Sequence, residues 1–466
     1  MRKANSYYFF NDDYIVRYEP LINCGMVYNV KKSRNTLVNR SGFNILKMLS
    51  KKPMNIDQIY HKLEKKIPKH SIEEFLEELI NKNILIKNQS KAEIAKHKII
   101  VVDGIEILPQ KIKYKPIWVL PILAEIFITF RCNMRCVHCI ENAGARTSEE
   151  LPKSTWFKVF DLLEENGITH VKINGGEPLV RKDIWDILEY LSKKIYKVYL
   201  LTNGILINRK YAQKIKEWDI MVALSLDGAT PTEHAFIRGK ESYFHAVINT
   251  MKLFKELGVR YTVTCIIHKK NYKSLEKIYD ICNNYNAEKI FFTVLELGGR
   301  AKINYKDISP QKDELIDILK NIKSIKEDKT KISINALYPL LMKISNENTS
   351  VNNKVNNKKK YLDEEIRCKA GNEIIVISSN GETYPCSVFI GNNNFMLGNI
   401  LNKTLQEIWF SEKLNIFRGA IKINDLNECK NCRYFIHCSD KYCRGKPYVH
   451  KNDWLAKPPL CDIYLE

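Results

Sequence analysis

The strongest constraint on the fold is a repeated alternation of short apolar runs and amphipathic helical segments in the middle of the chain. Six apolar runs lie at residues 123–130, 170–174, 198–202, 221–226, 260–267 and 289–295. Helical patterns lie between them, for example at 154–166, 183–194 and 244–257, and a glycine follows the first and the last of these three. Such alternation is typical of parallel β/α units. The sequence therefore predicts an α/β fold with a partial (β/α)6 barrel of the TIM type.

The chain has 466 residues, which leaves room for further domains on both sides of this barrel. Ahead of it, β-prone stretches at 7–10, 14–18 and 26–30 predict a small antiparallel sheet, and three short helices follow, the last with a Ser71–Glu74 capping box. This order predicts a winged-helix-like domain. Residues 346–360 are rich in Asn and Lys and predict a linker. We expect an N-terminal domain at 1–90, a connector at 91–118, the barrel at 119–325, a linker at 326–365 and a cysteine-rich domain at 366–466.

The charge balance is strongly basic, because 74 Lys and Arg residues exceed 53 Asp and Glu residues by 21. The excess is spread along the chain, so we interpret it as solvated surface and expect no nucleic-acid partner. The most apolar window, 117–130, is shorter than the roughly 20 residues that a membrane helix needs. The N-terminus carries no apolar signal segment, so we expect no membrane span and a cytoplasmic protein.

Three of the thirteen cysteines, Cys132, Cys136 and Cys139, directly follow the first barrel strand with the spacing C-x3-C-x2-C. Loops at the carboxyl ends of barrel strands carry active sites, and thiols in a reducing compartment more often bind metal than form disulfides. Three thiolates can hold three irons of a [4Fe-4S] cluster and leave the fourth iron open. A zinc site is the alternative, with His138 placed awkwardly as the fourth ligand.

Polar residues also follow the next three strands. Gly175-Gly176-Glu177-Pro178 ends the second strand, Asn203 the third, and Ser225 and Asp227 the fourth. The two glycines let the backbone approach a ligand closely, and Glu177 can accept a charge-assisted hydrogen bond from an ammonium group. The alternative for each residue taken alone is an ordinary turn or cap.

The cysteine loop followed by the Gly-Gly-Glu-Pro turn resembles the radical S-adenosylmethionine (SAM) superfamily. The resemblance implies that the amino and carboxylate groups of SAM chelate the open iron, and that reductive cleavage gives a 5'-deoxyadenosyl radical that abstracts hydrogen. It also implies a SAM-binding site formed by Gly175, Gly176, Glu177 and Pro178, by Ser225 and Arg238 at the carboxylate or ribose, and by Asn203 and Asp227 nearby.

Seven further cysteines lie near the end of the chain: Cys368, Cys386, Cys429, Cys432, Cys438, Cys443 and Cys461. Regular periodicity is weak there, so we expect metal ligation and not a large apolar core to order this region. The spacing resembles the SPASM domain, an auxiliary-cluster domain of radical SAM enzymes that modify peptides and proteins. It departs from that pattern before Cys443, where the gap is four residues instead of three.

The SPASM resemblance implies two auxiliary clusters beside the SAM-binding one, hence three [4Fe-4S] clusters in all. Cys429, Cys432, Cys438 and Cys461 would hold one, and Cys368, Cys386 and Cys443 the other. The second set lacks a fourth cysteine, and three alternatives stay open for that ligand. They are a substrate thiolate bound to a free iron, a non-cysteine group, and Cys265 or Cys282. Otherwise Cys24, Cys265 and Cys282 are interpreted as buried apolar residues.

A small winged-helix-like domain ahead of a radical SAM core is similar to the PqqD-like domain that recognises leader peptides. Such domains pair a leader strand with a sheet edge. A DNA-binding winged helix is the alternative. The layout most resembles sactipeptide synthases, which join a cysteine sulfur to an α-carbon during bacteriocin maturation.

This resemblance implies a precursor peptide with a leader as partner and an electron donor such as flavodoxin or ferredoxin. Cyclases that form β- or γ-thioethers or carbon–carbon crosslinks are alternatives, as are the anaerobic sulfatase maturases. The latter carry an Asp after the second SPASM cysteine, where this chain has Ser387. A non-enzymatic, basic iron–sulfur protein that binds nucleic acid is the remaining alternative. The sequence predicts no particular catalytic side chain.

Overall fold

The structure is a computed structural model. It describes residues 6–10, 14–19, 23–29, 34–88, 100–102, 114, 116–145, 149–195, 197–311, 314, 317–318, 322, 325, 332–335, 364–432, 443–459 and 461. The chain divides into two compact units. The first comprises Met1–Ile122 and Leu162–Thr169, and the second comprises Leu123–Asp161 and His170–Glu466.

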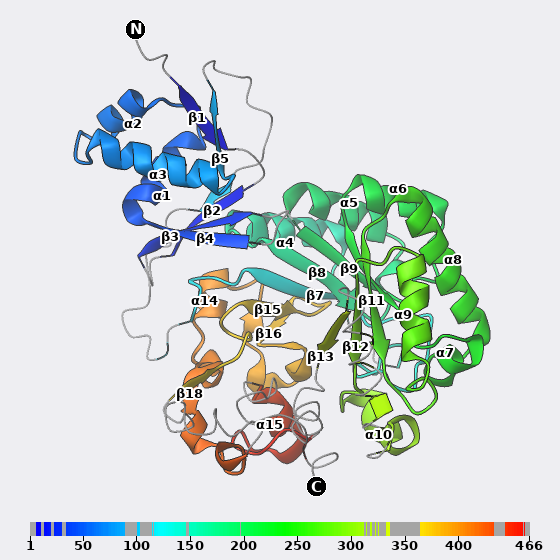
Figure 1. Ribbon diagram of the computed structural model, residues 1–466. Coiled ribbons are helices and arrows are strands. Elements are labelled where there is room, and N and C mark those ends of the chain that lie inside the picture. Colours follow the sequence, from blue (N-terminus) through cyan, green and yellow to red (C-terminus); the bar gives the residue numbers. More distant parts are fainter. Residues whose placement is uncertain are drawn as a thin grey trace. The chain divides into compact units, whose positions relative to one another are not determined.

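The first unit contains two small sheets (Figure 1). In one, β2 (Tyr14–Glu19), β3 (Cys24–Asn29) and β4 (Arg34–Asn39) are antiparallel, and β6 (Ile100–Val102) lies parallel to β2. In the other, β1 (Tyr7–Phe10) pairs with β5 (Leu85–Asn88). The predicted sheet of three consecutive strands is therefore wrong in detail, because β1 pairs with a strand that follows the helices and because β4 and β6 were missed.

Three helices of the first unit pack on these sheets: α1 (Arg40–Leu49), α2 (Ile56–Lys62) and α3 (Lys69–Asn81). Their buried apolar residues, among them Phe43, Leu46 and Leu76, share one core with the strands. The predicted Ser71–Glu74 capping box is wrong, since α3 begins after Pro68 and Ser71 lies within its first turn. The capping box of this unit is Asn55–Gln58, at the start of α2.

The second unit is built on a ten-stranded sheet of order β13-β12-β11-β10-β9-β8-β7-β15-β16-β17. Six of these strands are the predicted ones: β7 (Leu123–Thr129), β8 (His170–Gly175), β9 (Lys197–Thr202), β10 (Met221–Ser225), β11 (Tyr261–Ile266) and β12 (Lys289–Thr293). They are parallel, and each lies beside the next one in the chain. The predicted partial barrel of six β/α units is confirmed.

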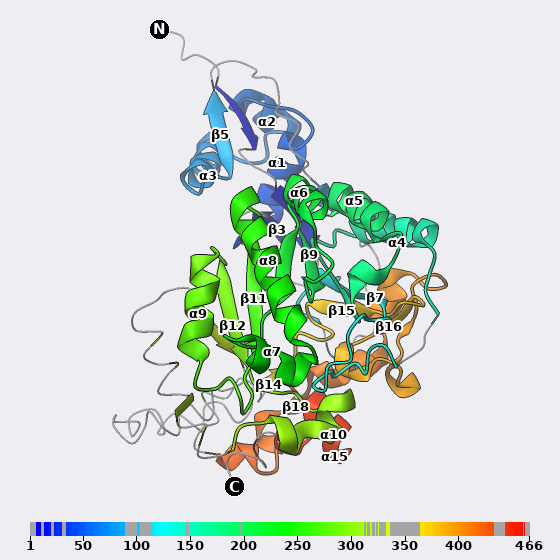
Figure 2. The ribbon, with the colours of Figure 1, turned by 90° about the vertical axis from the view of Figure 1, so that its right-hand side faces the viewer.

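Helices cover the outer face of these strands (Figures 1 and 2). They are α4 (Lys153–Glu165), α5 (Ile184–Lys194), α6 (Arg209–Glu217), α7 (Pro231–Arg238), α8 (Glu241–Leu257) and α9 (Leu275–Asn284), and α10 (Gly299–Ile308) follows β12. Each buries an apolar stripe, as α8 does with Val247, Met251 and Phe254. The strands are therefore apolar on the helix side, which is why their sequences appear as short hydrophobic runs.

Two additional strands extend the barrel sheet at its ends. β13 (Ile332–Asn335) lies parallel to β12 within the residues predicted as a linker, and β15 (Ile374–Ile377) lies parallel to β7. β16 (Glu382–Tyr384) and β17 (Gly398–Asn399) continue from β15 in antiparallel pairing. The cysteine-rich region thus adds strands directly to the barrel sheet. The predicted linker residues 346–360 lie outside the described residues.

The rest of the cysteine-rich region contains short elements around an aromatic cluster. β14 (Glu365–Arg367) pairs with β18 (Arg418–Lys422), and α14 (Leu405–Trp409) and α15 (Gly445–Lys451) are its α-helices in the described part. The aromatic cluster comprises Phe389, Phe395, Phe417, Tyr448 and Trp454, with ring centroids 4.2–6.3 Å apart. The region therefore has a small apolar core of its own, which the sequence analysis did not anticipate; the prediction that metal ligation orders the region stays a prediction.

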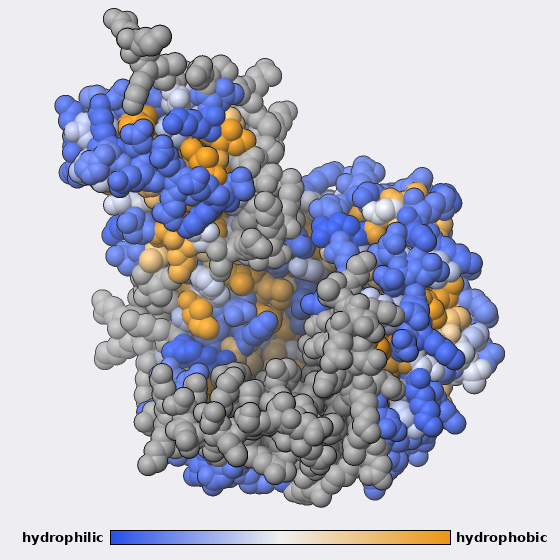
Figure 3. All heavy atoms as spheres, in the orientation of Figure 1, coloured by the Kyte–Doolittle hydropathy of each residue, from blue (hydrophilic) through white to orange (hydrophobic). Residues whose placement is uncertain are grey.

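No helix in the described residues is long and apolar enough to cross a membrane. Most described residues on the face shown in Figure 3 are hydrophilic, with small hydrophobic patches between them.

Candidate active site at the strand ends of the barrel

A cavity of about 420 Å³ opens at the carboxyl ends of the barrel strands. Every one of the six predicted strands contributes residues to its wall, directly or at its carboxyl end. These residues are Glu125 and Phe127 (β7), Asn174, Gly175 and the following Gly176 (β8), Leu201, Thr202 and the following Asn203 (β9), Ala223 and Ser225 (β10), Thr264 and Ile266 (β11), and Thr293 (β12). On β7, β10 and β11 the lining residues are separated by two positions, as expected for the inner face of a barrel, whereas at the ends of β8 and β9 they are consecutive. The cavity is therefore enclosed by all six predicted strands.

The three cysteines of the loop after β7 line this cavity together. The sulfur of Cys132 accepts a hydrogen bond from the Met134 amide at 3.4 Å, and that of Cys139 accepts one from the Ala143 amide at 3.3 Å. Burial raises the pKa of Cys136, and the charge of Arg238 opposes that rise. Donors aimed at sulfur stabilise thiolates, so this donor set fits an iron–sulfur cluster held by these cysteines.

The zinc alternative requires side chains that converge on one ion at about 2.0–2.3 Å. Among the described residues, no three His, Cys, Asp or Glu side chains are grouped in this way. His138, the fourth ligand considered above, is buried, and its Nδ1 lies 3.2 Å from the carbonyl oxygen of Ile237. A [4Fe-4S] cluster holds its thiolates farther apart than a single zinc ion does. The absence of a converging ligand group among the described residues therefore argues against zinc and not against a cluster.

The Gly-Gly-Glu-Pro turn packs against the backbone that leads into the cysteine loop. The amide of Gly176 donates to the Thr129 carbonyl at 2.8 Å, and that of Glu177 donates to the Arg131 carbonyl at 2.9 Å. A Cβ atom on Gly175 would lie 2.1 Å from the Thr129 oxygen, and one on Gly176 would lie 2.2 Å from the Arg131 oxygen. The close approach that requires glycine is therefore made by the chain itself, and both glycines also line the cavity.

Glu177 is buried and does not line the cavity. Its carboxylate accepts hydrogen bonds from the Leu179 amide (3.0 Å), the Thr202 hydroxyl (2.8 Å) and the Asn203 amide (2.7 Å). Burial raises its pKa, and these donors oppose that rise. Pro178 is also buried and begins a short 3-10 turn, Pro178–Val180. Glu177 thus joins the ends of β8 and β9 and places Asn203 at the cavity wall.

Asp227 and Arg238 form a buried ion pair behind the cavity. The Asp227 carboxylate accepts from Arg238 Nε at 2.5 Å and from the Ile266 amide at 2.7 Å. Burial would raise the pKa of Asp227, but Arg238, and then His138, lower it to about 2. Arg238 and Ser225 line the cavity, whereas Asp227 does not. Asp227 therefore positions Arg238 beside Cys136.

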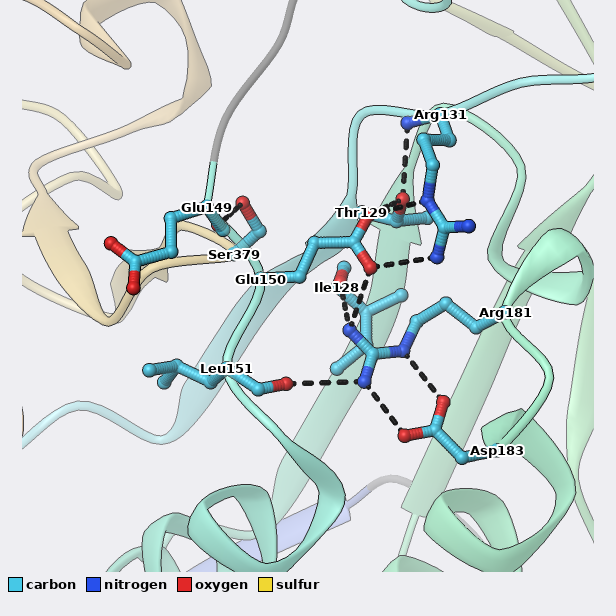
Figure 4. Close-up of polar contacts among 9 residues, drawn as sticks. All are labelled: Ile128, Thr129, Arg131, Glu149, Glu150, Leu151, Arg181, Asp183 and Ser379. Carbon is cyan, nitrogen blue, oxygen red and sulfur yellow. Dashed lines mark hydrogen bonds and ion pairs between the residues drawn. The ribbon is translucent and has the colours of Figure 1, made fainter.

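An ion-pair network fastens the far end of the cysteine loop (Figure 4). Glu150 accepts from Arg131 at 2.8 Å through each oxygen and from Arg181 at 3.2 Å. Arg181 also donates to both oxygens of Asp183 and to the carbonyls of Ile128 and Leu151. We call these four charged residues the loop clamp. The sequence analysis missed it, because its members come from three separate segments and no spacing links them.

Further cavity residues were also missed, among them Glu125, Asn174, Glu296, Arg300 and Ser387. The only signal for Glu125 was a charged residue within an apolar strand run. Asn174 donates to Glu125 at 3.0 Å. Ser387 directly follows Cys386, so the cysteine-rich region reaches the same cavity. A neighbouring cavity of about 530 Å³ shares Ile140, Glu141, Glu296 and Ser387 with the first.

The cysteines of the C-terminal region fall into two places. Cys368, Cys386 and Cys443 interact electrostatically with one another, and burial raises the pKa of Cys386 well above its usual range and that of Cys368 to about 11. Cys429 and Cys432 pack with Ile366, Ile421 and Leu426 in a small apolar cluster. Cys461 forms no disulfide within the described residues, and Cys438 lies outside them.

The other three cysteines lie elsewhere. Cys265 is buried on β11 and alternates with Thr264 and Ile266, which line the cavity, so its side chain points to the opposite face. Cys282 is buried on α9, and Cys24 is half-buried on β3. All three are free thiols in the described structure.

Comparison with known proteins agrees with this geometry. Residues 126–282 match the radical SAM superfamily, and residues 368–433 match an iron–sulfur cluster-binding domain, SPASM. The mycofactocin maturase MftC of Mycobacterium tuberculosis (strain CDC 1551 / Oshkosh) is 28% identical over 321 residues, which cover 68% of this chain and 77% of that protein.

The antilisterial bacteriocin subtilosin biosynthesis protein AlbA of Bacillus subtilis (strain 168) is 27% identical over 356 residues, 74% of this chain and 73% of that protein. Streptococcus suis SuiB, in a crystal structure with its precursor peptide SuiA, superposes with a TM-score of 0.69 at 17% identity over 96% of this chain and 98% of SuiB. The chain therefore carries a radical SAM domain followed by a SPASM iron–sulfur cluster-binding domain.

Proposed function

We propose that this chain is a radical SAM enzyme that modifies a ribosomally made precursor peptide, and that it forms intramolecular thioether crosslinks between cysteine sulfur and α-carbon atoms. The observation that carries the proposal is the shared cavity. Its wall includes both the three cysteines of the loop after β7 and Ser387, next to Cys386. A substrate residue in this cavity would lie between a SAM-binding cluster and an auxiliary cluster.

The residues at the cavity fit SAM bound to a [4Fe-4S] cluster. Cys132, Cys136 and Cys139 would hold the cluster, and Gly175, Gly176, Asn203, Ser225 and Arg238 offer backbone, amide, hydroxyl and guanidinium groups to SAM. Glu177 and Asp227 would act behind them, by fixing Asn203 and Arg238. When bound and reduced, this assembly supplies a 5'-deoxyadenosyl radical, which is the agent that abstracts hydrogen from the peptide.

Two auxiliary clusters are proposed for the cysteine-rich domain. Cys368, Cys386 and Cys443 would hold the one beside the cavity, with an iron left open for a substrate thiolate. Cys429, Cys432, Cys438 and Cys461 would hold the other. Cys265 faces away from the cavity and Cys282 lies on a helix outside it, so neither is favoured as the missing ligand.

Residues 1–90, which belong to the first unit, are proposed as the leader-recognition domain, and the other domain bounds are proposed as the sequence analysis gave them. Its four-stranded sheet has β4 and β6 at its edges among the described strands, and an extended leader would pair with such an edge. A flavodoxin or ferredoxin would supply electrons. We propose the cytoplasm as the compartment, because a reducing environment suits thiolate-bound clusters.

The test is anaerobic co-expression with a short cysteine-containing precursor peptide, followed by intact mass, thiol alkylation and fragmentation. Loss of two hydrogens for each thiol that resists alkylation is expected, with the bond at an α-carbon. Bonds at β- or γ-carbons would replace the α-thioether in the proposal. The same mass loss with all thiols reactive would mean carbon–carbon crosslinks, and absence of deoxyadenosine release from SAM would exclude radical SAM chemistry and favour a nucleic-acid-binding role.

A further inference from the structure

The cavity contains a carboxylate that the proposed function leaves without a role. Glu125 lies on β7, two positions before Phe127, and both side chains line the inner face of the barrel. It is only partly buried, so part of it faces the open space of the cavity. A carboxylate inside a barrel of apolar strands is costly unless it is solvated, paired or used, so its position calls for an explanation.

Two structural features fix Glu125 in place. Asn174 on β8 donates from Nδ2 to Glu125 Oε1 at 3.0 Å, and both residues line the cavity. In the sheet, Glu125 is the register partner of Lys172 on β8 and of Val376 on β15. The strand from the cysteine-rich domain therefore runs directly beside it.

Glu125 also lies close to the proposed auxiliary-cluster site. Burial raises the pKa of Cys386, and Cys368, Cys443 and then Glu125 raise it further through their charges. Ser387, the next residue, lines the same cavity as Glu125. A substrate residue in the cavity would thus face a wall that includes Glu125, the three cysteines of the loop after β7 and Ser387, the residue next to Cys386.

The other carboxylates at this cavity, within the described residues, are less suited to act on a substrate. Glu296 is ion-paired with Lys446 at 2.9 Å. Glu141 stands two residues after Cys139, on the cysteine loop, and borders the neighbouring cavity as well. Glu125 is the carboxylate on the barrel's inner face.

Crosslink formation requires a proton acceptor whatever bond is made. The acceptor carbon loses a hydrogen atom, which leaves as the new C–H bond of deoxyadenosine. The second group, a thiol S–H or a carbon C–H, then bonds to that carbon and releases one proton. The remaining electron passes to an oxidised iron–sulfur cluster. Hydrogen atom, proton and electron together account for the two hydrogens lost from the peptide.

We propose that Glu125 accepts the proton that the second group releases, with Asn174 as the positioning residue that holds its carboxylate. This inference rests on the proposed function. General bases of this kind contribute about 10²–10⁴-fold to a rate. Hydrogen abstraction precedes proton loss, so it does not need Glu125.

The test uses the full-length, iron-loaded protein with SAM, dithionite and the precursor peptide. Glu125→Gln keeps the size of the side chain and an oxygen for Asn174. We expect it to release deoxyadenosine within about twofold of wild type and to bind a fluorescent peptide with unchanged Kd, while crosslinking falls about 100-fold or more. Glu125→Asp restores a carboxylate and should crosslink at least tenfold faster than Glu125→Gln. Glu276→Gln, an exposed carboxylate on α9, is the matched control and should behave as wild type.

Wild-type crosslinking by Glu125→Gln would overturn the inference and leave the proposed function intact. So would a parallel loss of deoxyadenosine release and crosslinking at unchanged iron content, because Glu125 would then serve SAM or the cluster. If Glu125→Gln loses iron or fails to fold, Glu125→Ala decides, because it also removes the carboxylate. A crosslinking-to-deoxyadenosine ratio tenfold or more below wild type, without loss of peptide binding, supports the inference, and an unchanged ratio contradicts it. A wild-type protein that crosslinks no peptide would overturn the proposed function and with it this inference.

Discussion

The two cysteine-bearing regions of the second unit are ordered in different ways. The loop of Cys132, Cys136 and Cys139 is held by the regular barrel, through the Gly-Gly-Glu-Pro turn and the loop clamp. The C-terminal cysteines stand on short strands and 3-10 turns around an aromatic cluster, and Cys438 lies outside the described residues. From this difference we expect the fold to order the first site without a cluster, and the second set of cysteines to depend more on its clusters.

Removal of iron should have the largest effect and should separate the two regions. Structural metal sites contribute on the order of 10 kcal/mol to folding where the apo state is unfolded. We expect amide exchange in the turns that carry Cys429 and Cys432 to rise to the rate of unprotected chain in the anaerobic apo-protein, while β7–β12 stay protected. Hydrogen exchange by mass spectrometry measures both.

The aromatic cluster provides the internal control for this experiment. If Phe389 and Trp454 suffice to order the region, exchange there will stay slow in the apo-protein. Equal protection of both cysteine regions would show that the contrast is wrong. Equal loss in β7–β12 would show that the barrel also needs its cluster.

Loss of the loop clamp is the next largest effect. The side chain of Arg181 is 4% exposed and that of Glu150 is 19% exposed, and truncating one partner of a buried pair costs about 3–5 kcal/mol. In Arg181→Ala, Glu150 still has its ion pair with Arg131. We therefore expect the free energy of unfolding, measured in urea without oxygen, to fall by about 3 kcal/mol, and the cysteine loop to retain iron less well.

Arg209→Ala is the matched control, since its ion pair with Glu256 is more than half exposed. Exposed pairs contribute about 0–1 kcal/mol. Similar losses of stability in the two variants would mean that the clamp does not hold the loop.

The turn at Gly176 should give an intermediate effect. In Gly176→Ala, the added Cβ meets the Arg131 carbonyl, a backbone group that cannot move without shifting the cysteine loop. Overpacking of this kind costs about 1–3 kcal/mol. We expect the free energy of unfolding to fall by about 2 kcal/mol. We also expect SAM affinity, measured by equilibrium binding to the iron-loaded protein, to fall at least tenfold.

Gly258→Ala separates packing from backbone strain. Gly258 ends α8 with a positive φ of 66°, and its added Cβ would meet only Lys216 Nζ at 3.7 Å. The left-handed conformation costs about 1–2 kcal/mol for alanine. SAM affinity should not change. If SAM affinity falls equally in Gly176→Ala and Gly258→Ala, the loss of affinity comes from general destabilisation and not from the contact with the Arg131 carbonyl.

The same contrast explains what the sequence could predict. The six barrel strands were found within one or two residues, because their helix-facing residues are buried and apolar and leave short hydrophobic runs. β13 and β15 were missed because short strands join the sheet through pairings distant in sequence. At the site, the polar strand ends were found, but Glu125 and the loop clamp were not, since a single inward-facing carboxylate and long-range ion pairs leave no spacing to recognise.

The smallest effect is expected at Arg367 in the cysteine-rich region. Arg367 forms an ion pair with Glu365 at 2.6 Å, and the two side chains are 34% and 43% exposed. Arg367 is also the register partner of the buried Arg418. Burial, and then the charge of Arg367, lower the pKa of Arg418 to about 9. Arg367→Ala removes an attraction and a repulsion together, so unfolding free energy should change by less than about 0.5 kcal/mol. Glu365→Gln removes only the attraction and should destabilise more. A loss above about 2 kcal/mol for Arg367→Ala would mean that ion pairs, and not the aromatic cluster with its iron sites, hold this region together.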